Sequence, residues 1–136
     1  MNDRGPNALT KILAFGVVME VVTGIALIFK PAVVIKLLLG ADASGMEMVI
    51  GRCFGIGLFG LVFACWPDTQ KSVSSTAAFR GMLIFNALIA AYLAYLGIAG
   101  HVGGLLLWPA VAVHAVMTGL LVRSMRIDPP APEVEE

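Results

Sequence analysis

Hydrophobic residues gather in four long stretches, separated by short segments that hold most of the charged and turn-forming residues. The stretches run over residues 12–29, 46–66, 81–98 and 102–122. A helix that crosses the hydrocarbon core of a bilayer needs about 20 mostly apolar residues, and each stretch approaches that length. The pattern therefore predicts an all-α integral membrane protein whose four helices pack as an up-down-up-down bundle.

The segments between the stretches predict different connections. Residues 31–40 are amphipathic and begin with a proline, which is typical of a short helix that lies in the membrane interface. Residues 99–101 are so few that they predict a tight hairpin. The last nine residues, 128–136, hold three prolines and four acidic residues. We expect them to form a disordered acidic tail after a membrane domain that covers residues 1–127.

Composition and charge agree with a membrane protein. Of the 136 residues 59% are hydrophobic and 13% are charged, and the mean hydropathy is +0.91. These values lie far outside the range of soluble domains, so the bilayer is the expected solvent. Nine lysines and arginines balance nine acidic residues. Because no basic cluster stands out, we expect no nucleic-acid binding.

The distribution of positive charge predicts the orientation. An even number of spans places both termini on one side of the membrane. Six cations fall on that side and two on the other: Arg4, Lys11, Lys71, Arg80, Arg123 and Arg126 against Lys30 and Lys36. The positive-inside rule then predicts that both termini are cytoplasmic.

Residue types that bind cofactors are too widely spaced to act together. Cys53 and Cys65 share one predicted helix and lie about 18 Å apart along it, so they cannot form a disulfide. His101 and His114 are separated by about 20 Å in the same way and cannot hold one haem iron. The sequence has no Cys-x-x-Cys or His-x-x-x-His motif. We therefore expect neither a metal nor a cofactor, and no pairing of nucleophile and base that would make the chain an enzyme.

Each predicted span contains one residue that hydrocarbon disfavours: Glu20, Arg52, Asn86 and His114. A charge at the bilayer centre costs at least roughly 2.5 to 3.5 kcal/mol, so such groups normally face the bundle interior and find partners there. Small residues lie one turn from Glu20, Asn86 and His114, which permits close helix approach on those faces. These four residues are the candidate site.

Two arrangements of Glu20 and Arg52 are open. In the first, the two side chains form an ion pair, and Glu20 is a structural clamp. In the second, Arg52 extends toward lipid phosphates at the other face, because its backbone lies about one turn farther out than that of Glu20. An unpaired Glu20 would be a candidate site for a proton or a cation.

Several motifs also resemble known families. Glu20-x-x-Thr-Gly-x-Ala-Leu, Gly51-Arg52, Ala64-Cys65-Trp66, Phe85-Asn86 and Leu107-Trp108-Pro109-Ala-Val-x-x-His114 together resemble a group of uncharacterised four-span bacterial inner-membrane proteins, with a distant likeness to DoxX-like proteins. The resemblance implies a bacterial inner-membrane location and no particular activity. Glu20, midway along the first span, is also similar to the carboxylate of the small multidrug resistance transporters. Arg52 is foreign to that second pattern.

Two functions follow as expectations. The first is an accessory or assembly protein that acts through helix packing in the bilayer, as a homo-oligomer or with a membrane-protein partner; small residues and the lack of catalytic motifs favour it. The second is a proton-coupled transporter or a binder of lipophilic small molecules. That function would use Glu20, Asn86 and His114 around a kink predicted at Pro109.

Overall fold

The computed structural model of the chain describes residues 8–65 and 77–127. These residues form helices and no strand. The helices are α1 (Ala8–Phe29), α2 (Pro31–Leu39), α3 (Met46–Ala64), α4 (Ala77–Ile98) and α5 (Leu107–Ile127). All except α2 are long and apolar enough to cross a bilayer. The predicted all-α bundle with four spans is confirmed.

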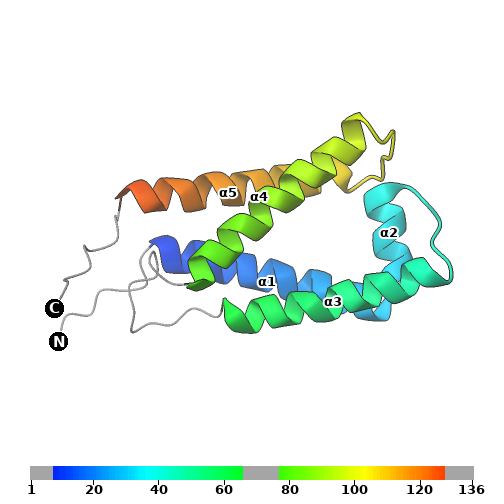
Figure 1. The fold of residues 1–136 in the computed structure, drawn as a ribbon, viewed down its shortest axis with the longest axis horizontal. Helices are drawn as coiled ribbons and strands as arrows, with labels where there is room; N and C mark the ends of the chain where they lie inside the picture. Colours follow the sequence, from blue (N-terminus) through cyan, green and yellow to red (C-terminus); the bar gives the residue numbers. More distant parts are fainter. Residues whose placement is uncertain (1–7, 66–76, 128–136) are drawn as a thin grey trace.

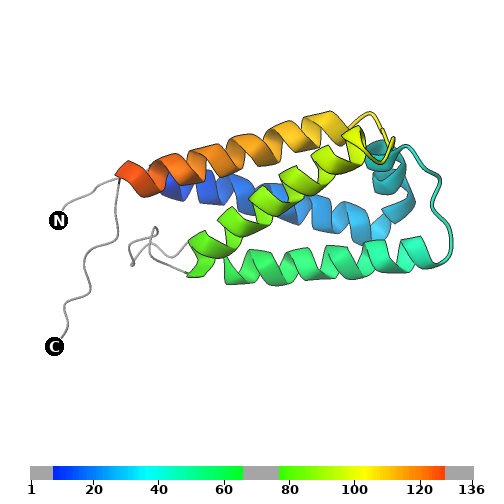
Figure 2. The same ribbon diagram turned by 45° about the horizontal axis from the view of Figure 1, so that its top comes forward.

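The four long helices lie along one direction, with α4 inclined to the other three (Figures 1 and 2). Helix α1 begins and helix α5 ends at the same end of the bundle, which we call the terminal end. Helix α2 lies across the opposite end, which we call the α2 end (Figure 1). The short helix expected after the first span is therefore present, over Pro31–Leu39.

The bundle consists of two helix pairs. Helix α1 packs mainly against α3, and α4 packs mainly against α5. A buried apolar cluster near the terminal end joins the two pairs; its members are Leu13, Val17, Val62, Cys65, Phe79, Met82 and Leu121. Because these residues come from all four spans, the cluster holds the pairs together at that end.

The outer surface of the spans is apolar. Phe29, Phe63 and Leu88 are 73%, 75% and 64% exposed, and many other large hydrophobic side chains also face outward. Water would disfavour so continuous an apolar surface, whereas lipid chains accept it. The chain is therefore a multi-pass membrane protein.

The helices differ from the predicted spans at their polar ends. Helices α1 and α4 begin at Ala8 and Ala77, four residues before the apolar stretches, because the helical backbone continues past Lys11 and Arg80, the charged residues that precede those stretches. Helix α3 ends at Ala64. The predicted tail over residues 128–136 and Trp66 lie outside the described residues.

The start of α5 corrects two predictions. The fourth span was expected from Val102 after a tight hairpin, but α5 begins at Leu107 and residues 99–106 form the connection. Pro109 therefore lies in the first turn of α5, where backbone N–H groups have no partner inside the helix. A proline there breaks no helical hydrogen bond, so the kink predicted before His114 has no cause.

The connection between α4 and α5 is bound to the end of α2. The amide of Gly104 donates to the carbonyl of Leu38 at 3.1 Å, and the amide of Leu106 donates to the carbonyl of Leu37 at 2.8 Å. The last carbonyls of a helix lack partners within it, and these two bonds supply them. We call this contact the α2 clip. It joins the first helix pair to the second at the α2 end.

Candidate functional site

Asn86 and His114 form a hydrogen-bonded pair between α4 and α5. Asn86 is 2% exposed, and its Oδ1 lies 2.8 Å from Nδ1 of His114. The Nδ2 of Asn86 donates to the carbonyl of Met82 at 2.8 Å. Since the amide oxygen is an acceptor, Nδ1 of His114 carries the proton in this arrangement, and Nε2 is left as an acceptor. Two of the four candidate residues thus meet inside the bundle.

The imidazole of His114 is held on further sides. The ring of Phe85 meets it edge to face, with ring centroids 6.1 Å apart and an interplanar angle of 78°. One turn along α5, the hydroxyl of Thr118 donates to the backbone carbonyl of His114 at 2.8 Å. The imidazole is thereby held in position between an amide and an aromatic ring, which is typical of a positioned rather than a solvated histidine.

Glu20 lies inside the bundle as the small residues around it predicted. It is 4% exposed, although its side chain is a carboxylic acid. Among the described residues no hydrogen bond or ion pair joins its carboxyl group to another side chain. The Glu20 carboxyl interacts electrostatically with the thiol of Cys65. A carboxylate in low-dielectric surroundings with no cation beside it is disfavoured. The chain therefore holds this group in a state that calls for a proton or a counter-ion.

Arg52 does not reach Glu20. Its Nε donates to the backbone carbonyl of Ile28 at 3.3 Å, near the end of α1, and its side chain is exposed. The reason is the register of α1 against α3, which brings Gly24 opposite Gly55. Arg52 is three residues before Gly55 and so lies beside the last turn of α1, about two turns from Glu20. The ion pair with Glu20 is therefore absent, and an extension of Arg52 toward lipid phosphates stays a prediction.

Glu20, Asn86 and the half-buried His114 lie at one level of the bundle. A methyl group on Gly16 would stand 3.0 Å from Cε of Met117 and 3.6 Å from Sδ of Met82, so α1, α4 and α5 meet at this point. Glu20 follows Gly16 by one turn, Asn86 follows Met82 by one turn, and His114 precedes Met117 by about one turn. Given the directions of the three helices, each of these steps leads toward the α2 end.

We call Glu20, Asn86 and His114 the polar layer. Three of the four predicted residues lie at this level, and of these Asn86 and His114 are in hydrogen-bond contact. Arg52 lies apart from it. Sequence reasoning missed the two methionines beneath the layer and the ring of Phe85 beside it. Their long, flexible or aromatic side chains are ordinary in a span, and no motif distinguishes them.

Comparison with protein-family models, with curated proteins and with solved structures finds no match to this chain. The chemistry of the site must therefore be read from its own residues. In the described parts of the chain no three His, Cys, Asp or Glu side chains converge in a way that would hold a metal ion. The polar layer offers one carboxyl group and one imidazole acceptor, and the aromatic ring of Phe85 lies beside the imidazole.

Proposed function

We propose that this chain is a bacterial inner-membrane protein that binds lipophilic organic cations at the polar layer, in exchange with a proton on Glu20. The observation that carries the proposal is that Glu20 is 4% exposed and forms no ion pair with a described residue. Such a group is stable when it is protonated or when a cation from outside the chain lies beside it. Exchange between these two states is the basis of proton-coupled binding and transport.

The residues at the level of Glu20 suit a lipophilic cation. The ring of Phe85, beside His114, would provide a face for cation–π contact. Nε2 of His114 would accept a hydrogen bond from a ligand that has a donor. Met82 and Met117 pack around Gly16, one turn below Glu20, and methionine side chains adjust to ligands of different shape. Lys11, Arg80 and Arg123 at the terminal end support an orientation with that end in the cytoplasm.

The proposal predicts that Glu20→Gln weakens the binding of tetraphenylphosphonium by at least about tenfold, equivalent to 1.4 kcal/mol. Glutamine keeps the size of the side chain and removes its negative charge. Binding is measured by equilibrium dialysis on protein in lipid nanodiscs. For the unaltered protein we expect the apparent Kd to rise as pH falls, because protons compete with the cation for Glu20.

The matched control is Glu47→Gln. Glu47 lies in the first turn of α3, where its carboxylate accepts from the amide of Ser44 in an exposed position. This variant should bind the cation as the unaltered protein does. Equal binding by the Glu20 and Glu47 variants, or binding that does not change between pH 6 and pH 8, would contradict the proposal.

One observation favours the second candidate, an assembly protein that acts through helix contacts. Helix α3 carries an outward stripe of small residues at helical spacing, Cys53, Gly57, Gly60 and Ala64, all exposed. A methyl group on Gly57 or Gly60 would meet no atom of the described chain within 4 Å. In membranes such small-residue faces let a second helix approach closely. The partner we propose for this face is a second copy of α3.

A two-fold pairing of α3 predicts that Cys53 cross-links between copies upon mild oxidation in vesicles, in a Cys65→Ser background. Gly57→Leu and Gly60→Leu should reduce the cross-linked fraction at least about fivefold, because the larger side chains keep the helices apart. Gly119→Leu is the control, since Gly119 is also exposed with open space beside it but lies on α5. Equal cross-linking in all three variants would rule out this pairing.

A further inference from the structure

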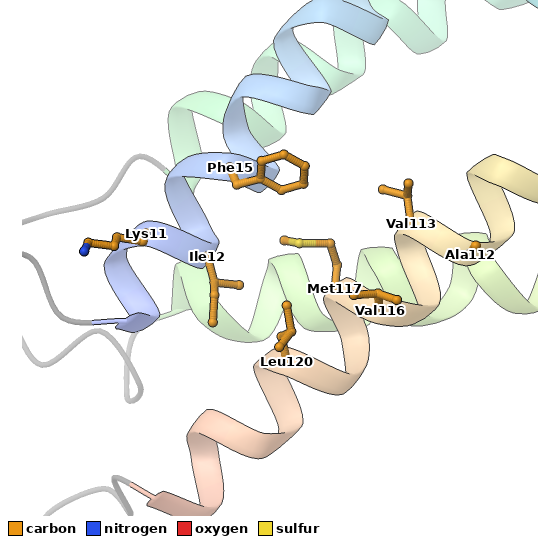
Figure 3. A pocket seen from close by; sticks show the side chains of 8 residues that line it. All are labelled: Lys11, Ile12, Phe15, Ala112, Val113, Val116, Met117 and Leu120. Atoms are coloured by element: carbon orange, nitrogen blue, oxygen red, sulfur yellow. The ribbon is translucent and has the colours of Figure 1, made fainter.

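A groove separates α1 from α5 on the outer surface of the bundle, on the side toward the terminal end (Figure 3). Its volume is about 420 Å³. The lining residues are Lys11, Ile12, Phe15, Ala112, Val113, Val116, Met117 and Leu120. Lys11 is the only polar side chain among them. The groove lies where the two helix pairs are adjacent, and α1 and α5 make few contacts there.

The length and the lining of the groove suit a hydrocarbon chain. Along α5 the lining extends from Ala112 to Leu120, about 12 Å at 1.5 Å per residue. The groove is lined by apolar side chains apart from Lys11 and opens on the outer surface of the spans. An apolar groove that faces lipid suits a hydrocarbon chain of a lipid molecule.

The positive charges at the terminal end of the groove favour a lipid with an anionic headgroup. The Lys11 side chain extends from the lining toward the terminal end, with its ammonium group directed away from the apolar residues (Figure 3). Arg123, three residues after Leu120, continues the lining face of α5 by one turn and is exposed. The acidic residues that the structure describes, Glu20, Asp42 and Glu47, all lie elsewhere. Among the described residues, no acidic side chain therefore lies beside Lys11 and Arg123.

We propose that the groove holds one acyl chain of an anionic phospholipid, whose phosphate lies between Lys11 and Arg123. The site is separate from the polar layer and does not depend on the function proposed for Glu20. Met117 lies between the two, since it lines the groove and also packs against Gly16. An acyl chain in the groove would press on Met117 and hold α5 against α1.

The test uses the full chain in nanodiscs of equal amounts of phosphatidylglycerol and phosphatidylcholine with identical acyl chains. Lipids that remain bound after transfer to detergent are counted by native mass spectrometry. We expect one phosphatidylglycerol to be retained in preference to phosphatidylcholine. Lys11→Gln should lower that preference about fivefold, the effect expected for one cation near an anionic lipid. Lys30→Gln, which removes a cation at the α2 end, should leave it unchanged.

A second pair of variants tests the groove itself. Ala112→Phe places a ring among the lining residues and should abolish retention of either lipid. Ala91→Phe is the control, because Ala91 is an exposed alanine on α4 outside the groove. Circular dichroism checks that both variants fold. Equal retention of the two lipids by the unaltered protein, equal preference in the two lysine variants, or normal retention by the folded Ala112 variant would each overturn the proposal.

Discussion

Gly104→Ala is expected to lower the free energy of unfolding by about 3 kcal/mol, at the upper end of the costs of overpacking. A methyl group on Gly104 would overlap the carbonyl oxygen of Leu37 and stand 2.7 Å from the carbonyl carbon of Leu38. Both neighbours belong to the backbone, so no change of rotamer relieves the contact. The loop must move away and break the hydrogen bonds of the α2 clip.

Unfolding by sodium dodecyl sulfate in mixed micelles, followed by circular dichroism, measures this loss. The adjacent Gly103→Ala is the control, because a methyl group on Gly103 would have no atom within 4 Å. Alanine restricts the unfolded chain more than glycine does, so the control should be neutral or slightly stabilising. If the two variants lose the same stability, the α2 clip does not hold the loop as described.

Gly55→Ala is expected to lower the free energy of unfolding by about 2 kcal/mol, because it adds a methyl group where α1 and α3 cross in close contact. Its methyl group would stand 2.8 Å from the carbonyl oxygen of Gly24 and 3.0 Å from Cβ of Leu27. The two helices must separate by several tenths of an ångström. Since Arg52 donates to the carbonyl of Ile28 across the same crossing at 3.3 Å, that bond should weaken as well.

The same unfolding measurement applies, with Gly119→Ala as the control on a lipid-facing position of α5. The control makes the same change from glycine to alanine in a spanning helix, at a position where the added methyl group meets no neighbouring atom. We expect it to gain a few tenths of a kcal/mol from helix propensity. A loss of the same size in both variants would mean that the close approach at Gly24 and Gly55 contributes nothing to stability.

The number of spans could be predicted from the sequence because burial in lipid imposes a length and a hydropathy that few other structures share. The residues at which the helices begin and end were harder to predict from the sequence. Ala8 and Ala77 begin helices before the apolar stretches do, and residues 102–106 are apolar without being helical. The amides of Gly104 and Leu106 bind the end of α2 instead of continuing a helix, and such a contact between distant segments leaves no local signal.

The sequence predicted which residues belong to the candidate site, but it did not predict which of them contact one another. Charge and polarity single out Glu20, Asn86 and His114 in their apolar surroundings. Whether Arg52 would meet Glu20 depended on the register of two helices, and that register is set by the contact of Gly24 with Gly55. The groove was not foreseen at all, because its lining comes from both α1 and α5 and consists of residues that any span contains.

The bundle is tied at both ends, by the α2 clip at one end and by the apolar cluster at the other. The polar layer lies between the α2 clip and the apolar cluster. A ligand that enters from water at either end would have to separate the residues of one of these contacts. A ligand that enters from the lipid, between two helices, would have to displace side chains only. The concentration that governs the rate of entry is then the concentration dissolved in the bilayer. For the cations proposed to bind at the polar layer, association rates measured against the concentration in water should therefore rank by the partition coefficients of the ligands.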